Sequence, residues 1–177
     1  MRKFPQIAEK SHTMERPKIH IELDEMDRIL EVAGWLALAV LIALPIYYYG
    51  QLPEQIPTHF SVNGEPDDYN RKATIWMLPI LGTAMYIGMF YLNKFPHIFN
   101  YTVEITEENA ATQYRFATKM IRILNTIIAF IFAYIAYGSI QVAMGYQDGL
   151  GQYFLAFFLL ATFGTIGYFL SKSYKKK

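Results

Sequence analysis

The sequence predicts an all-α integral membrane protein whose four transmembrane helices form a four-helix bundle. Three observations lead to this fold class. Of the 177 residues, 53% are hydrophobic and 18% are charged, whereas roughly 25% of the residues are charged in an ordinary soluble domain. The apolar residues are gathered in blocks of about 20, the length that crosses a bilayer. Lys and Arg are concentrated in alternate segments between these blocks, as expected for a chain that crosses a membrane repeatedly.

The apolar blocks divide the chain into spans and connections. Each block is too long and too poor in charge to be a buried strand of a soluble protein. The N-terminal region lacks an apolar core followed by a small-residue cleavage site, so we expect no removable signal peptide. The expected order is a cytoplasmic tail at 1–29, a span at 30–50, an outer loop at 51–72, a span at 73–95, a cytoplasmic segment at 96–119, a span at 120–144, a short outer loop at 145–151, a span at 152–171 and a basic tail at 172–177.

The distribution of Lys and Arg predicts the orientation. Both tails and the segment between the second and third spans are rich in Lys and Arg, whereas the 51–72 loop carries Glu54, Glu65, Asp67 and Asp68. Because cytoplasmic loops carry an excess of positive charge, we expect both termini in the cytoplasm and the 51–72 loop on the extracytoplasmic side. The expected location is the bacterial plasma (inner) membrane, crossed several times.

Two segments outside the spans alternate apolar and polar residues, which predicts strands. The strand-like part of "PKIHIELD" is 18–23, and that of "NYTVEIT" is 101–105. An isolated strand would leave its backbone groups unpaired. We therefore expect the two to form a small cytoplasmic β-ribbon, either within one chain or between two copies.

Helix starts are expected next to these segments. Asp24 can cap a helix that leads into the first span, and Thr106 can cap one that continues into the third. On this second helix, Arg115, Lys119 and Arg122 share one face. One interpretation is an anchor to anionic lipid, and the alternative is a docking face for an acidic cytoplasmic partner.

The outer loop, which contains "IPTHFSVNGEPDD", has the composition of a structured segment. Its prolines stiffen the chain, and the pair Asn63-Gly64 is a strong signal for a tight turn. A loop of this kind often carries a function. The candidate ligand-binding residues on the outer face are Pro57, His59, Phe60, Asn63, Gly64, Asp67, Asp68 and Lys72.

His59 has three interpretations in this loop. It can be a metal ligand together with Asp67 or Asp68. It can be a pH-sensitive contact, because its intrinsic pKa is near neutrality. Its ring can instead bond a turn carbonyl or Asp67 and hold the loop closed.

Several classes of function are disfavoured by the sequence. We find no H-E-x-x-H, no G-x-S-x-G and no phosphate-binding glycine loop, and Ser61 beside His59 lacks an orienting partner. The central turns of the spans lack ionisable residues, which argues against ion-coupled transport; Asn125 and Thr126 are interpreted as interhelical hydrogen-bonding groups. The net charge of +1 gives no indication of nucleic acid. We expect neither enzymatic activity nor a cofactor.

The outer loop and the start of the next span resemble the family called domain of unknown function 1648, found in bacterial membrane proteins. Its pattern is L-P-x-x-I-P-x-H-F, a turn, G-x-P-D and a basic residue. The matching positions are Leu52, Pro53, Ile56, Pro57, His59, Phe60, Gly64, Pro66, Asp67 and Lys72. The resemblance covers residues 30–80. Because some members are similar to SdpI, it implies an immunity and signalling protein that protects its cell from a secreted peptide toxin and relays its presence to a cytoplasmic repressor.

Three functions follow from these observations. The leading hypothesis is a non-enzymatic sensor or immunity protein whose outer loop meets a peptide or envelope ligand. The second is a scaffold or subunit of a membrane complex, and the third is passage of a small neutral solute. The expected partners are the lipid bilayer, the outer ligand, and a cytoplasmic protein or a second copy of the chain.

Overall fold

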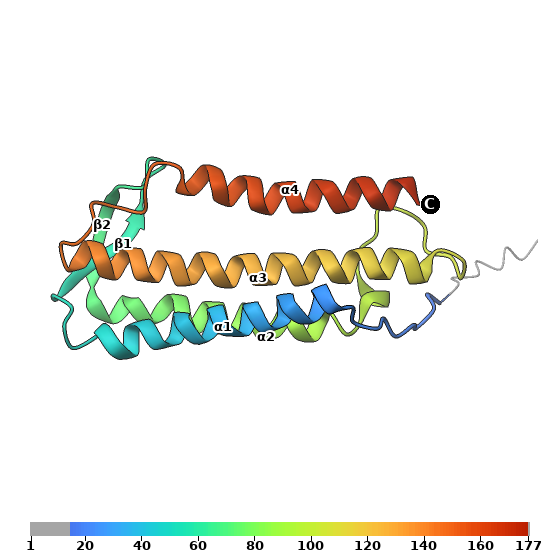
Figure 1. Cartoon of the computed structure of the whole chain (residues 1–177), viewed down its shortest axis with the longest axis horizontal. Coiled ribbons are helices and arrows are strands. Elements are labelled where there is room, and N and C mark those ends of the chain that lie inside the picture. Colours follow the sequence, from blue (N-terminus) through green and yellow to red (C-terminus); the bar gives the residue numbers. More distant parts are fainter. Residues whose placement is uncertain (1–14, 177) are drawn as a thin grey trace, which may run out of the picture.

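A computed structural model describes residues 15–176, shown in Figure 1. It is mostly helical, as predicted, and contains four helices long and apolar enough to cross a membrane. They are α1 (Glu25–Tyr48), α2 (Met77–Leu92, extended at its start by the 3-10 turn Lys72–Trp76), α3 (Ala110–Ala143) and α4 (Phe154–Lys175). Residues 1–14 of the predicted cytoplasmic tail, with Arg2, Lys3 and Lys10, lie outside the described residues.

The helix α3 lies in the middle of the molecule, with α1 and α2 on one side and α4 on the other (Figure 1). Half of the apolar window of α3 is buried, whereas 6% of that of α4 is. The strands and the α3–α4 connection lie at one end, called the hairpin end below. The C-terminus and the 93–109 connection lie at the other, called the terminal end (Figure 1).

The start of α1 follows the predicted capping residue, whereas α3 begins at Ala110, later than predicted, with Asn109 and not Thr106 at its N-cap. The Asp24 carboxylate accepts a hydrogen bond from the Asp27 N–H, and the Asp27 carboxylate accepts one from the Asp24 N–H, which satisfies two otherwise unpaired donors. Before α3, Thr106 and Asn109 form a similar reciprocal pair. From Ala110 the helix continues without a break to Ala143, because no proline or glycine interrupts its first 28 residues, up to Gly138.

Small residues let α1, α2 and α3 approach closely. Ala129, Ala133 and Ala136 of α3 are buried against Leu41 of α1 and Tyr86 of α2. Polar side chains in this core bond to the backbone of the neighbouring helix. The Asn125 amide donates to the Tyr86 carbonyl (3.1 Å), and the Thr126 hydroxyl donates to the Leu30 carbonyl (3.0 Å). The interpretation of these two residues as interhelical hydrogen-bonding groups is confirmed.

The predicted cytoplasmic β-ribbon does not form within one chain. Residues 18–23 and 101–105 have no strand structure, and among the described residues the one sheet is elsewhere. The apolar positions of both segments pack on the helix bundle instead of forming one face of a ribbon. Tyr101, for example, lies with its ring 5.5 Å from that of Tyr114 on α3, and its hydroxyl donates to the Pro96 carbonyl (2.9 Å). The alternation of apolar and polar residues therefore reflects a side that packs on the bundle and a side that is exposed, and the segments do not pair as strands.

The sheet is an antiparallel hairpin in the predicted outer loop, formed by β1 (Gln55–Phe60) and β2 (Pro66–Arg71). The sequence analysis predicts a structured loop there but no strands. The register is regular from Gln55↔Arg71 to Pro57↔Tyr69 and irregular around His59. Below the hairpin, a small core of Leu52, Ile56, Ile75 and Ile140 joins it to the bundle.

Candidate functional site

The tip of the hairpin is docked on the α3–α4 connection. The Leu150 N–H donates to the Gly64 carbonyl (2.8 Å). Gly64 has a φ of +83°, and a Cβ placed there would lie 2.5 Å from the Gly151 carbonyl oxygen. Only glycine fits both the backbone conformation and the close approach. Gly64, proposed above as a ligand-binding residue, is thus buried in an internal contact.

His59 and Asp67 face each other across the hairpin. The Nδ1 atom of His59 lies 2.5 Å from Oδ1 of Asp67, with side chains 68% and 46% exposed. This contact corresponds to the third interpretation of His59, in which its ring bonds to Asp67 and holds the loop closed. An exposed pair of this kind contributes little to stability, on the order of 0–1 kcal/mol, so both groups remain accessible to a ligand.

A cavity of about 580 Å³ lies between the hairpin, α2, α3 and the start of α4; we call it the hairpin pocket. Its rim is polar and includes Thr58, His59, Asp68, Asn70 and Thr74. Its wall is apolar and includes Ile56, Leu78, Leu81, Ile135, Leu150 and Phe154. The volume is within the range of small-molecule sites, roughly 300–1,000 Å³. Such an arrangement suits a ligand that has one polar and one apolar part.

The rim is ordered by hydrogen bonds within the hairpin. The Asn70 amide donates to the Thr58 hydroxyl (2.8 Å) and to Oδ2 of Asp68 (3.0 Å). The sequence analysis missed Thr58 and Asn70. A signal for Asn70 was present, because residues two apart on a strand share a face and Asn70 follows Asp68 at that spacing. No local signal could indicate Phe154, which is distant in the sequence.

The predicted outer-loop residues divide into three groups, apart from Asp67, which pairs with His59 and does not line the hairpin pocket. His59, Phe60 and Asp68 line the hairpin pocket, as does the buried Pro57. Asn63 and Gly64 lie in the turn, away from that pocket. Lys72 pairs with Glu54 (3.0 Å) and lies over the Tyr49 ring.

The hairpin end carries an excess of acidic residues. Over 51–72 and 144–153 there are five acids, Glu54, Glu65, Asp67, Asp68 and Asp148, against the two bases Arg71 and Lys72. Of these acids, Glu54 forms a salt bridge with Lys72. The electrostatic field at the hairpin pocket therefore favours a positively charged group.

The metal interpretation of His59 gains no third ligand in the part of the chain that the structure describes. His59 and Asp67 were the candidates, and they stand as a pair. Residues 15–176 contain no group of three or more His, Cys, Asp or Glu side chains that could hold a metal ion.

The basic face of α3 is directed at α1 and not at lipid, which corrects the sequence interpretation. Nη1 of Arg122 lies 3.0 Å from Oδ1 of Asp27, and Nε of Arg122 donates to Oε1 of Glu31 (2.9 Å). Lys119 contacts Asp24, and Arg115 lies 3.8 Å from Asp24. These six residues form the α1–α3 ionic cluster. Sequence reasoning found the basic face but not its acidic complement, which lies about 90 residues earlier in the chain.

The cluster changes the ionisation of its most exposed acid. The pKa of Asp24 is lowered to about 2, mainly by the hydrogen bond from Lys119 and then by the Asp27 backbone N–H. Asp24 therefore stays charged throughout the physiological pH range. Arg115, Lys119 and Arg122 have internal partners, and Arg122 is nearly fully buried.

Comparisons with known proteins identify the hairpin region. Residues 36–83, which include most of α1, the whole hairpin and the start of α2, match the family model "Domain of unknown function (DUF1648)". A protein of Archaeoglobus fulgidus, described as uncharacterized, is 32% identical over 73 residues, which are 37% of this chain and 40% of that relative. The chain thus spans about two fifths of that relative's length. No solved structure matches. The family resemblance seen in the sequence is thus found at residues 36–83, the part of the chain that contains the hairpin.

Proposed function

We propose that this is a non-enzymatic, multi-pass membrane protein that receives a ligand at its hairpin end, in the manner of a sensor or an SdpI-like immunity protein. The excess of Lys and Arg at the terminal end supports an orientation with the hairpin outside the cell. Its location is the plasma membrane.

The hairpin pocket is the observation that carries this proposal. It joins a polar rim, with His59 and Asp68, to an apolar wall formed by α2, α3 and α4. Together with the acidic field, this favours a peptide that has a basic group and an apolar side chain. The basic group contacts Asp68, and the apolar side chain enters between Leu78 and Phe154.

The helix α3 connects the hairpin end with the terminal end and can transmit a structural change between them. Ile140 of α3 packs against Ile56 of β1, and the same helix carries Arg122, which pairs with α1. A ligand that changes the position of the hairpin can therefore change the contact between α3 and α1. This continuity supports a relay to a cytoplasmic protein.

Site-specific photocrosslinking in the native host tests the proposal. A photoreactive residue replaces Phe60, which lines the hairpin pocket, and the crosslinked products are identified by mass spectrometry. The matched control replaces Tyr146, an exposed aromatic residue of the same end that does not line the pocket. We expect position 60 to capture a secreted peptide or an envelope component that position 146 does not capture. Crosslinks from position 60 that stay within the chain would contradict the proposal.

A scaffold or subunit role is the second candidate, and the exposure of α4 favours it. The helix α4 packs mainly on α3. Its exposed apolar side chains include Phe157, Leu160 and Phe163. Under this role His59→Ala and Asp67→Ala would reduce function only as far as they reduce protein abundance. Passage of a neutral solute has less support, because Asn125 and Thr126 are engaged in a packed core.

A further inference from the structure

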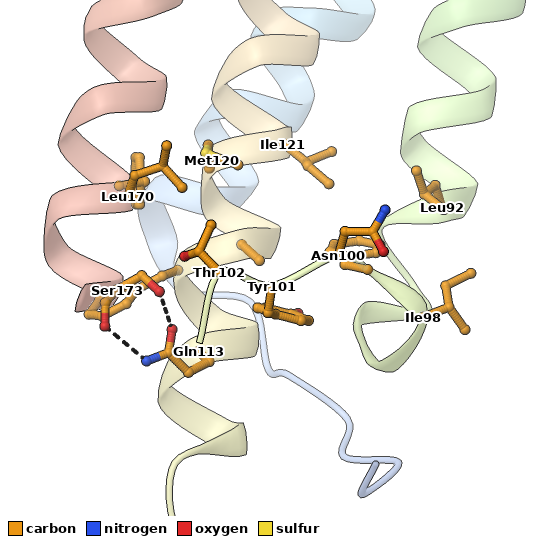
Figure 2. Close-up of a pocket in the computed structure, with 14 residues that line it drawn as sticks. Leu92, Ile98, Asn100, Tyr101, Thr102, Gln113, Met120, Ile121, Leu170 and Ser173 are labelled. Atoms are coloured by element: carbon orange, nitrogen blue, oxygen red, sulfur yellow. Dashed lines mark hydrogen bonds between the residues drawn. The ribbon is translucent and has the colours of Figure 1, made fainter. Parts of the chain in front are cut away.

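The terminal end contains two cavities with different chemistry. The first, of about 380 Å³, lies between α2, α3 and α4 and is lined by uncharged residues. Figure 2 shows two hydrogen bonds in its lining: the Ser173 hydroxyl donates to the Gln113 side-chain oxygen (2.6 Å), and the Gln113 amide donates to the Ser173 carbonyl (3.1 Å). Because these polar groups satisfy each other, this cavity offers no charged group that would select a ligand.

The second cavity, of about 410 Å³, contains charged residues, and we call it the charged cavity. It lies between residues 20–23, which precede α1, the helix α1, the end of α2 with the connection that follows it, and α3. Its apolar lining is Ile21, Leu23, Phe90 and Pro96, and its polar lining is His20, Glu31, Asn93, Lys94, Thr118 and Arg122. The volume is within the range of small-molecule sites. The charged cavity takes no part in the function proposed above.

The acidic charge in this lining is already neutralised. Glu31 is the one acid among the described residues that line the charged cavity, and its Oε1 atom accepts a hydrogen bond from Nε of Arg122 (2.9 Å). Both belong to the α1–α3 ionic cluster, in which three acids balance three bases. Glu22 lies between Ile21 and Leu23 in the sequence but does not line the cavity. The lining therefore holds no acid that could neutralise a further cation.

Lys94 is such a further cation. Its ammonium group lies over the ring of Phe90 (5.2 Å), which lines the same cavity, and over the ring of Tyr91 (4.9 Å). Within residues 15–176 it forms no salt bridge, and the side chain of His20 forms neither a hydrogen bond nor an ion pair. An imidazole keeps a ring N–H in either ionisation state. His20 and Lys94 can therefore hold an anion between them.

The balance of charge in the lining selects a monoanion. Lys94 is matched by one negative charge, which a carboxylate carries at neutral pH. A phosphate monoester carries about 1.5 to 2 negative charges, so the excess would lie in the same cavity as Glu31. The apolar side chains of the lining are stabilised when they are covered by an apolar group of the ligand.

We infer that the charged cavity binds a carboxylate with an apolar body. The carboxylate lies between Lys94 and His20, and the apolar body packs against Ile21, Leu23 and Phe90. The site is independent of the hairpin pocket and lies at the opposite end of the bundle. Small soluble acids and fatty acids share this chemistry.

Isothermal titration calorimetry of the purified full chain in an uncharged detergent tests the ligand class. The probes are phenylacetate, 2-phenylethanol, which has the same ring and the same number of carbons but no charge, and phenyl phosphate. We expect one phenylacetate to bind per chain, about fivefold more tightly than 2-phenylethanol, the factor typical of a partly exposed ion pair. Equal affinities of these two compounds, or tighter binding of phenyl phosphate than of phenylacetate, would overturn the inference.

Decanoate separates the two sources of such a carboxylate. It carries the same charge on a long, flexible chain. Tighter binding of decanoate than of phenylacetate would identify the ligand as a fatty acid, and weaker binding would identify it as a small soluble acid.

A pair of lysine variants tests the contact with the carboxylate. Lys94→Gln removes the cation of the charged cavity, whereas Lys172→Gln removes a lysine of the same end that lies over Tyr168 (5.6 Å) and does not line the cavity. Both side chains are exposed, so neither change disturbs the packing. We expect Lys94→Gln to weaken phenylacetate binding about fivefold and to leave 2-phenylethanol binding unchanged, with no effect of Lys172→Gln. Equal losses in the two variants would contradict the proposed site.

Single cysteines test the position of the ligand, because the chain contains no cysteine of its own. Ile19→Cys and Ile21→Cys introduce a thiol into the same segment at two half-buried positions, of which position 21 alone lines the charged cavity. The rate of labelling by N-ethylmaleimide is measured with and without phenylacetate. We expect the acid to remove most of the labelling rate at position 21 and none at position 19. Equal protection of both positions, or of neither, would overturn the assignment of the ligand to this cavity.

Discussion

Arg122 of α3 and Asp27 of α1 form an ion pair with a separation of 3.0 Å, and their side chains are 9% and 3% exposed. The two helices are adjacent along much of their length, but this pair fixes their register at the terminal end. The pair therefore gives the sharpest test of the fold.

Asp27→Ala should strongly destabilise the bundle. The variant takes one of two acids away from the buried Arg122, which keeps Glu31, so the cost approaches but does not reach the roughly 3–5 kcal/mol of a fully uncompensated buried charge. The measurement is the free energy of unfolding in detergent, with Asp148→Ala, an exposed acid of the α3–α4 connection, as the control. A loss no larger than that of Asp148→Ala would contradict a stabilising role of the Arg122–Asp27 pair and mean that Glu31 is a sufficient partner for Arg122.

Stability should fall in acid because of Asp24. Its folded pKa of about 2 lies below the ordinary value of about 3.9, so this contribution is complete above pH 4 and is lost as the pH falls towards 2. Asp24→Asn retains a capping side chain but has no charge. The difference in unfolding midpoint between the two proteins should therefore shrink from pH 5 to pH 2. A difference that does not change with pH would rule out this charge as its source.

Gly64→Ala should destabilise the hairpin end. The substitution places a Cβ against the Gly151 backbone in a left-handed conformation, which costs about 1–2 kcal/mol for a non-glycine residue before the contact is considered. Gly50→Ala is the control, because a Cβ there has no neighbour within 4 Å. Thermal unfolding of both variants measures the difference, and equal midpoints would mean that the hairpin tip is not docked.

His59→Ala should leave stability nearly unchanged, within about 1 kcal/mol, because the His59–Asp67 pair is exposed. Under the receptor function, the same variant should lose capture of the ligand from position 60 while remaining as abundant as the unmodified protein. Immunoblotting together with crosslink yield separates the two effects. Normal capture of the ligand by the His59→Ala variant would show that His59 takes no part in ligand binding.

The sequence was sufficient where local information determines the structure. The apolar blocks predicted the helices, and Asp24 predicted the start of α1, because length, hydropathy and capping are properties of neighbouring residues. The match to the DUF1648 family, at 36–83, was likewise visible in the motif around His59.

The sequence was misleading where contacts between distant segments determine the structure. Residues 18–23 alternate more regularly than the strand Pro66–Arg71, yet the latter forms a ladder because Gln55–Phe60 lies beside it. Likewise, the spacing of Arg115, Lys119 and Arg122 defined a face but not its partner. Only the approach of α1 supplies Asp24, Asp27 and Glu31.

The helices α3 and α4 differ in length, and this determines the depth of the hairpin pocket. Phe154, the first residue of α4, stacks on Tyr134, so the last nine residues of α3, 135–143, extend about 13 Å further at 1.5 Å per residue. The hairpin occupies the place beside these turns that a longer α4 would fill. Since α4 is itself about 33 Å long, close to the thickness of the hydrocarbon layer, the proposed orientation places the polar rim of the hairpin pocket at the level of the lipid headgroups. Under the proposed function, a ligand therefore partitions onto the membrane surface before it binds, and its concentration in the surrounding medium is not the concentration that the protein meets.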